Sequence, residues 1–269
     1  LIVTEDAYIP VWGTYITTPS VNEKFAKVNV LTKVVLPEGA DPAKYSVETS
    51  VWNPNKQKLT AVRTSLAQMK YDNDQAEQEF IIQDPSLWSP EMPALYSAET
   101  RLYEGDQLKD VYTTPFGIRS IEIIPDKGFF LNGKRTVFKG VCNHHDLGPL
   151  GAAVNDAAIR RQIRILKDMG CNAIRTSHNM PAPELIRACD EMGMMIMAES
   201  FDEWNVAKCK NGYNLLFDEW AEKDLVNLLH NFRNNPSVVM WCIGNEMDGP
   251  WQVGHMSPDE YAAAVDRVA

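Results

Sequence analysis

The stretch Val238-Val239-Met240-Trp241-Cys242-Ile243-Gly244-Asn245-Glu246 decides how the rest of the chain is interpreted. It begins as an unbroken apolar run, which is typical of a strand buried on both faces of a parallel sheet. It ends abruptly in Asn245 and Glu246, and barrel enzymes carry their reactive groups at the carboxyl ends of such strands. A half-buried Glu246 would keep its proton near neutral pH and act as a general acid. The plainer alternative is that Glu246 caps the next helix.

Upstream of this stretch, strand and helix patterns alternate. We expect three more strands, at Val137–Asn143, Asn172–His178 and Met194–Ala198. We expect helices from Asn155 or Asp156 to Gly170, over Pro183–Met192, and over Phe217–Arg233 with Trp220, Leu225, Leu228, Leu229 and Phe232 inward. Ser257 and Glu260 form the capping box of a final helix. Four such units predict a parallel, helix-covered sheet, equal to half of a (β/α)8 barrel.

The rival arrangement is a doubly wound sheet, which would need a glycine-rich nucleotide turn after its first strand. Gly140-Val141-Cys142-Asn143 matches that turn poorly. The fold class we expect is therefore multidomain, β plus α/β, with a barrel-type second part. It comprises the first four βα units of a TIM (β/α)8 barrel over residues 124–269.

The part of the chain before about Ile123 has a different period. Alternating apolar residues and turn clusters predict short strands, at Ala26–Leu36, Tyr45–Trp52, Phe80–Ile82, Leu95–Tyr103 and Val111–Thr114. This spacing predicts an immunoglobulin-like β-sandwich over residues 8–123, which lacks the usual cysteine pair and serves as a scaffold. Asn132-Gly133 between strand-like flanks predicts a hairpin just after it.

Composition narrows the partners. The formal net charge is −10, which argues against nucleic acid or an anionic membrane, and no apolar run is long enough to span a bilayer. The cysteines number five, an odd count without a Cys-x-x-Cys pair, so neither a disulfide framework nor a zinc site is expected. The sequence leaves both the cytoplasm and a bacterial periplasm open as compartments.

Polar side chains follow all four predicted barrel strands. They are His144 after the first, Arg175 and His178 at the second, Asp202 and Trp204 after the third, and Asn245 with Glu246 at the fourth. In a barrel these ends meet at one mouth. One polar strand end is commonly structural, but four together need partners and indicate an active site. A metal site at His144 and His145 is disfavoured, because adjacent strand residues point to opposite faces.

Several ordered motifs resemble one known family. They are Trp88-Ser89-Pro90-Glu91 with Leu95-Tyr96, Phe116 to Arg119, Phe130 to Lys134, Gly140 to His145, Asn172 to His178, and Asn234 to Glu246. In these the chain resembles the family 2 glycoside hydrolases, which include β-galactosidases, β-glucuronidases and β-mannosidases. The resemblance implies a sugar-binding jelly roll, an immunoglobulin-like domain and a (β/α)8 barrel. Residues 1–7 would then be the end of the jelly roll.

The resemblance also implies roles for the strand-end residues. Glu246 matches the general acid/base and Asn245 the residue that contacts the sugar 2-hydroxyl. Three others match the lining of the glycone pocket, namely Arg175, His178 and His144. Asp202 and Trp204 fall where the family has further sugar contacts. The implied reaction retains the anomeric configuration through two carboxylates roughly 5–5.5 Å apart.

The chain departs from the family in two ways. The nucleophilic Glu should follow a later barrel strand, and neither Glu199 nor Glu203 lies on the right one, so we expect this chain to be inactive alone. Metal-dependent relatives carry Glu and His where this chain has Ala207 and Cys209, so we expect no cofactor, magnesium included. The expected partner is a carbohydrate substrate, and the open edges of a half barrel favour association into a homo-oligomer.

Two alternatives stay open. A non-catalytic carbohydrate-binding or scaffold module would keep the same strand-end residues for binding alone. Within the enzymatic interpretation, a β-galactosidase-like specificity competes with β-glucuronidase or β-mannosidase specificity. The acidic charge of the chain disfavours glucuronate.

Overall fold

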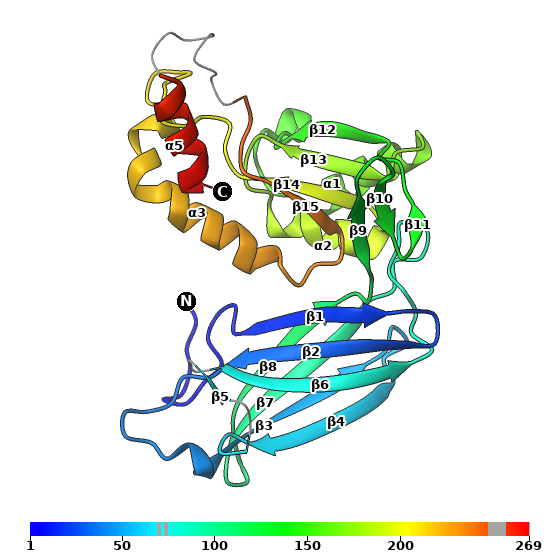
Figure 1. Ribbon diagram of the computed structural model, residues 1–269, viewed down its shortest axis with the longest axis vertical. Helices are drawn as coiled ribbons and strands as arrows, with labels where there is room; N and C mark the ends of the chain where they lie inside the picture. Colours follow the sequence, from blue (N-terminus) through cyan, green and yellow to red (C-terminus); the bar gives the residue numbers. More distant parts are fainter. Residues whose placement is uncertain (69–70, 73–74, 247–256, 269) are drawn as a thin grey trace. The chain divides into compact units, whose positions relative to one another are not determined.

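The computed structural model describes residues 1–68, 71–72, 75–246 and 257–268, and the chain divides into two compact units (Figure 1). The sandwich unit comprises Leu1–Val137 together with Arg233–Pro236. The βα unit comprises Phe138–Phe232 and Ser237–Ala269. No helix of the described segments has the length and apolar character needed to cross a membrane.

The sandwich unit contains two four-stranded antiparallel sheets. One has the order β1 (Thr14–Val21), β2 (Phe25–Lys33), β6 (Gln75–Gln83), β5 (Tyr71–Asp72). The other has the order β4 (Lys58–Ser65), β3 (Tyr45–Trp52), β7 (Tyr96–Glu104), β8 (Gln107–Phe116). Ala26, Val28 and Val30 alternate with polar residues along β2 and are completely buried, as the period of two predicted.

A small third sheet follows the sandwich strands. It contains β9 (Ile121–Ile124), β10 (Gly128–Leu131) and β11 (Lys134–Arg135). The predicted hairpin is present, because Leu131 pairs with Lys134 across the two-residue turn Asn132-Gly133, and both turn residues have positive φ. This sheet belongs to the sandwich unit, so the unit extends to Val137.

The βα unit contains a four-stranded parallel sheet in sequential order (Figure 1). Its strands are β12 (Gly140–His144), β13 (Ala173–Ser177), β14 (Met195–Glu199) and β15 (Val238–Cys242). The helices between them are α1 (Asp156–Asp168), α2 (Pro183–Met192) and α3 (Phe217–Phe232), and α5 (Pro258–Val268) comes last. A doubly wound sheet would reverse its strand order, so the sequential order is that of barrel units.

One face of this sheet packs against the helices. Ile174, Ile196 and Val238 from the strands share a core with Ile163 of α1 and Ile186 of α2. In the paired register, Arg175 and Met197 occupy the opposite face, because neighbouring strand residues point to opposite sides. The helix-covered core therefore fixes which side chains can reach the inside of the barrel.

Several element boundaries agree with the sequence and a few side-chain directions do not. Helix α2 begins at Pro183 and ends before Gly193, which adopts a left-handed conformation, and Ser257 and Glu260 form the predicted capping box. The prediction that Trp220 and Leu229 point inward was wrong, since they are 42% and 41% exposed. The buried stripe of α3 is formed by Phe217, Ala221, Leu228 and Phe232.

Candidate active site

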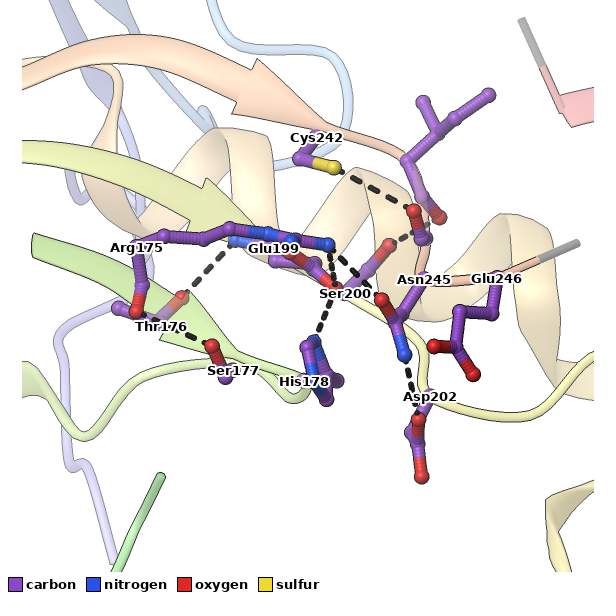
Figure 2. Close-up of polar contacts among 12 residues, drawn as sticks. Arg175, Thr176, Ser177, His178, Glu199, Ser200, Asp202, Cys242, Asn245 and Glu246 are labelled. Atoms are coloured by element: carbon purple, nitrogen blue, oxygen red, sulfur yellow. Dashed lines mark hydrogen bonds and ion pairs between the residues drawn. The ribbon is translucent and has the colours of Figure 1, made fainter. Parts of the chain in front are cut away.

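The polar side chains expected at the mouth meet at the carboxyl ends of β13, β14 and β15 (Figure 2). Arg175 lies within β13, Glu199 is the last residue of β14, and Asn245 follows β15 by three residues. Because the strands are parallel and adjacent, their ends point the same way and their side chains converge. This convergence is the arrangement that the sequence predicted.

Glu199 is the centre of the cluster and is fully buried. Arg175 donates from Nε to one carboxylate oxygen and from Nη2 to the other, the second at 3.0 Å. His178 Nδ1 lies 2.9 Å from Oε1 of the same carboxylate, which can only accept, so Nδ1 is the donor. The Glu199 carboxylate raises the pKa of Arg175 further above its ordinary value. The result is a fixed guanidinium and an oriented imidazole.

Asn245 extends the network to the next strand end. Its Oδ1 accepts from Arg175 Nη2 at 3.1 Å, and its Nδ2 donates to Asp202 Oδ1 at 3.0 Å, so both ends of the amide are fixed. Burial raises the pKa of Asp202, but the hydrogen bonds from Asn245 and Lys208 outweigh it and hold that pKa below its ordinary value. The ionised form of Asp202 is therefore favoured, and its exposed carboxylate lies beside the oriented amide of Asn245.

Glu246 follows Asn245 and lies beside Asp202 in Figure 2. Its side chain is 79% exposed, and its Oε2 lies 3.6 Å from Lys208 Nζ. The expectation of a half-buried carboxyl was wrong. Glu246 has a positive φ of 39°, and Asn245 occupies the buried position instead.

The two adjacent histidines separate as expected. His144 contacts His178 edge to face, with ring centroids 5.0 Å apart, which brings it to the same mouth. His145 turns elsewhere and places Nε2 2.9 Å from the carbonyl oxygen of Ala152. Only His144 of the pair can therefore join the cluster around Glu199.

Trp204 does not offer a sugar-binding surface, contrary to the expectation. Only 5% of it is exposed, and its ring packs among Phe201 and Phe217. The indole also lies against Gly244, where an added Cβ would approach Nε1 to 2.6 Å. The aromatic cluster buries the indole ring. Trp204 therefore packs against the backbone that leads into Asn245 and supports it.

Two residues of the site were not assigned from the sequence. Glu199 was set aside because its strand is wrong for a nucleophile, although its place at a buried strand end beside Arg175 was a usable signal. The register gives the reason, since Arg175 pairs with Met197 and Glu199 points to the same face two residues later. Lys208 gave no signal, because its loop has no periodic pattern.

The described residues around Glu246 do not fit the magnesium ion of metal-dependent relatives. Positions 207 and 209 hold an alanine and a cysteine, and the Cys209 contact is made by its backbone N–H. The Lys208 ammonium beside Glu246 would repel a second cation. Within the described ranges, no group of three metal-ligating side chains is found.

Two family profiles match the sequence. One, described as "Glycosyl hydrolases family 2, TIM barrel domain", covers residues 122–267, and another, "Glycosyl hydrolases family 2", covers residues 8–119. A β-galactosidase of Bacteroides ovatus is 44% identical over 240 residues, which are 89% of this chain and 28% of that protein. A β-glucuronidase of Bacteroides fragilis is 30% identical over 261 residues, which are 96% of this chain and 36% of that protein.

Solved structures give the same answer. A β-glycosidase from Bacteroides vulgatus has a TM-score of 0.85 at 33% identity, covering 100% of this chain and 33% of that one. The structure of Bacteroides uniformis β-glucuronidase 2 covalently bound to cyclophellitol-6-carboxylate aziridine has a TM-score of 0.76 at 26% identity, covering 98% and 32%.

A sandwich followed by barrel-type βα units, with charged strand ends at one mouth, defines the architecture of a multidomain glycoside hydrolase. The chain belongs to glycosyl hydrolase family 2. The expected immunoglobulin-like sandwich and partial TIM barrel are confirmed. The chain spans about a third of the length of the relatives it matches.

Proposed function

We propose that the protein carrying this chain is a retaining exo-β-glycosidase of β-galactosidase type, with Glu246 as the general acid/base. The observation that supports this most is the hydrogen-bonded series Glu199, Arg175, Asn245, Asp202, which links three strand ends and leads to Glu246. A site that only binds a sugar needs a complementary shape and a few hydrogen-bond donors. A continuous set of fixed charges beside an exposed carboxyl suits proton transfer.

The reaction would have two steps. First, Glu246 gives its proton to the glycosidic oxygen while a second carboxylate attacks the anomeric carbon and the bond to the leaving group breaks. Then water attacks the glycosyl-enzyme and gives its proton to the Glu246 carboxylate, which frees the second carboxylate. The exposed position of Glu246 gives leaving group and water access to the same oxygen atoms.

The glycone would be held by the groups around Glu246. Asn245 faces the mouth with an amide fixed by Arg175 and Asp202, which suits the sugar 2-hydroxyl. The Asp202 carboxylate accepts hydroxyl hydrogens and would repel the carboxylate of a glucuronoside. This repulsion, and the 44% identity to a β-galactosidase, favour a neutral sugar such as galactose.

Among the described residues of this mouth, no acidic group is available as the second carboxylate. Glu199 is held by Arg175 and His178, and Glu203 is held by backbone N–H groups. Asp202 is tied to Asn245 and Lys208. We therefore place the nucleophile in the part of the protein outside this chain, since relatives are about three times as long.

The test uses the complete protein and a panel of nitrophenyl β-glycosides. We expect turnover of the β-galactoside and loss of activity on an unactivated galactoside in Glu246→Ala, with azide restoring turnover of an activated aryl galactoside. Normal turnover by Glu246→Ala on an unactivated sugar would remove the assignment. The exposure of Glu246 favours one alternative, a module that binds sugar without hydrolysing it. In that case, glycosides of the panel would be bound and none would be hydrolysed.

A further inference from the structure

A lysine is held between the carboxylates of two strand ends. Lys208 lies in the loop between β14 and α3, and its Nζ is 3.3 Å from Asp202 Oδ1 and 3.6 Å from Glu246 Oε2. Its side chain is only 28% exposed, whereas that of Glu246 is 79% exposed. The lysine is thus the more firmly enclosed partner, and the carboxylate of Glu246 is the group that it can position.

The backbone at Lys208 is fixed by a separate group. The buried carboxylate of Glu203 accepts from the backbone N–H groups of Lys208, of Cys209 at 3.1 Å and of Asn214 at 3.1 Å. Burial raises the pKa of Glu203, but these backbone donors outweigh it and hold that pKa below its ordinary value. The loop therefore keeps Lys208 in place whether or not Glu246 is ionised.

We propose that Lys208 is a positioning residue for the acid/base, and that its ammonium is the resident cation of this site in place of a divalent metal. The proposal rests on the proposed function of Glu246. When Glu246 gives its proton to the leaving oxygen, the new negative charge forms beside an ammonium that is already in position. A charge that develops next to a fixed cation requires no rearrangement of the site.

The direction of the effect follows from the charges. Removing the ammonium disfavours the ionised form of Glu246, so the proton donor becomes weaker. Leaving groups that need a proton, such as alkyl alcohols and sugars, would suffer, while dinitrophenolate would leave without help. The alkaline limb of the pH–rate profile reports loss of the donor's proton, so it moves to higher pH when the cation is removed.

The experiment compares Lys208→Met, Lys208→Arg and a control, Lys210→Met, in the complete protein. Lys210 is an exposed lysine of the same loop. We expect Lys208→Met to lower kcat/KM about tenfold on a methyl or disaccharide substrate and at most about twofold on a dinitrophenyl glycoside. We expect the alkaline limb of its pH–rate profile to move to higher pH by roughly half a unit, which is the size of effect that an exposed ion pair produces. Lys208→Arg restores both values, and Lys210→Met changes neither.

Two results would overturn the proposal. One is a Lys208→Met variant with the leaving-group dependence and pH profile of the parent protein. The other is a parent protein that EDTA inactivates and magnesium restores, because a metal would then be the cation. The proposed function is tested separately: if azide rescues Glu246→Ala while Lys208→Met behaves as the parent, only the role of Lys208 falls. Equal melting temperatures for the variants exclude a folding defect.

Discussion

Glu199 is fully buried and forms ion pairs with Arg175 and His178. Burial of an isolated carboxylate is costly, and here the cost is offset by a bidentate guanidinium and an imidazole. The same contacts fix the directions of Arg175 and His178, which face the mouth. Glu199 therefore acts on the site through its neighbours, and its loss would disturb both stability and substrate binding.

The first prediction concerns Glu199→Gln in the complete protein. The substitution keeps the shape but removes the charge that pairs with Arg175, and breaking such a pair typically costs about 3 kcal/mol. We expect a lower urea midpoint and a raised KM, because Arg175 and His178 lose their orientation. Glu222→Gln, an exposed position on α3, is the matched control and should change neither. An unchanged KM in Glu199→Gln would contradict the role given to it.

The second prediction concerns pH and the loop anchor Glu203. Its pKa in the folded protein lies below the ordinary value of 4.5, so its stabilising effect is present above that value and is lost as the pH falls through the folded one. We expect Glu203→Gln to cost about 2 kcal/mol at pH 7, and the difference from the parent protein to shrink below about pH 4. Urea unfolding across this pH range measures it, and a constant difference would refute it.

For single residues, the polar residue types of the site were predictable from the sequence, whereas the burial of individual side chains was not. The polar types at the strand ends follow from the pattern, and the structure brings Arg175, His178, Asn245 and Asp202 together. Glu246 has a positive φ and an exposed side chain, and no side-chain pattern reveals either. The burial of Trp204 depends on aromatic partners that come from a loop and a helix.

At the scale of elements, the end of β15 depends on a close approach between Gly244 and Trp204. A Cβ at position 244 would come within 2.6 Å of the indole nitrogen, which is too close for ordinary contact. Because Gly244 has no side chain, the backbone after β15 can pass the indole and place Asn245 in its observed position. The aromatic cluster and the amide of Asn245 are therefore coupled through one glycine.

The third prediction tests this coupling with Gly244→Ala. We expect a loss of about 2 kcal/mol from overpacking and a raised KM, because the shift is passed to Asn245. Trp204→Phe removes the indole nitrogen that the new methyl group would strike. The double variant should therefore lose less than the sum of the single losses in urea unfolding. Additive losses would show that the contact does not couple the two residues.

Elements with clear local signals were predicted well. Pro183 and Gly193 bound α2, and Ser257 with Glu260 caps α5, because these signals act within a few residues. Strands β1 and β4 were not predicted. Strand β4 is an edge strand with mostly exposed residues, and alternation is lost when neither face is deeply buried. The inward face of α3 was misjudged because apolar residues surround more than one side of it.

At the scale of the molecule, the order of the units was readable because the hydrophobic period changes from two to the helical spacing. The boundary is harder to read, since the β9–β11 sheet and Arg233–Pro236 both belong to the sandwich unit. Asn234 shows the reason: its side chain accepts from the backbone N–H of Ile16 and donates to the carbonyl of Thr14. Long-range contacts of this kind leave no local sequence pattern.

The fourth prediction concerns residues 1–269 expressed alone. In the described part of the βα unit, β12 and β15 are the outer strands of the parallel sheet, and each has one neighbour. Unpaired strand edges recruit other chains or destabilise the sheet. We expect this polypeptide to self-associate in light scattering or to melt without a cooperative transition. A monodisperse monomer with a sharp melt would contradict the prediction.

The anchoring of the β14–α3 loop by Glu203 distinguishes positions that its contacts constrain from positions that they leave open to substitution. The Glu203 carboxylate accepts hydrogen bonds from backbone N–H groups, and a Cβ on Gly212 would collide with it. Positions 203 and 212 are therefore constrained. The exposed side chains of Ala207 and Lys210 are not needed for this anchoring. Libraries randomised at Ala207 and Lys210 should retain folding, so variants of the site can be selected there without rebuilding the scaffold.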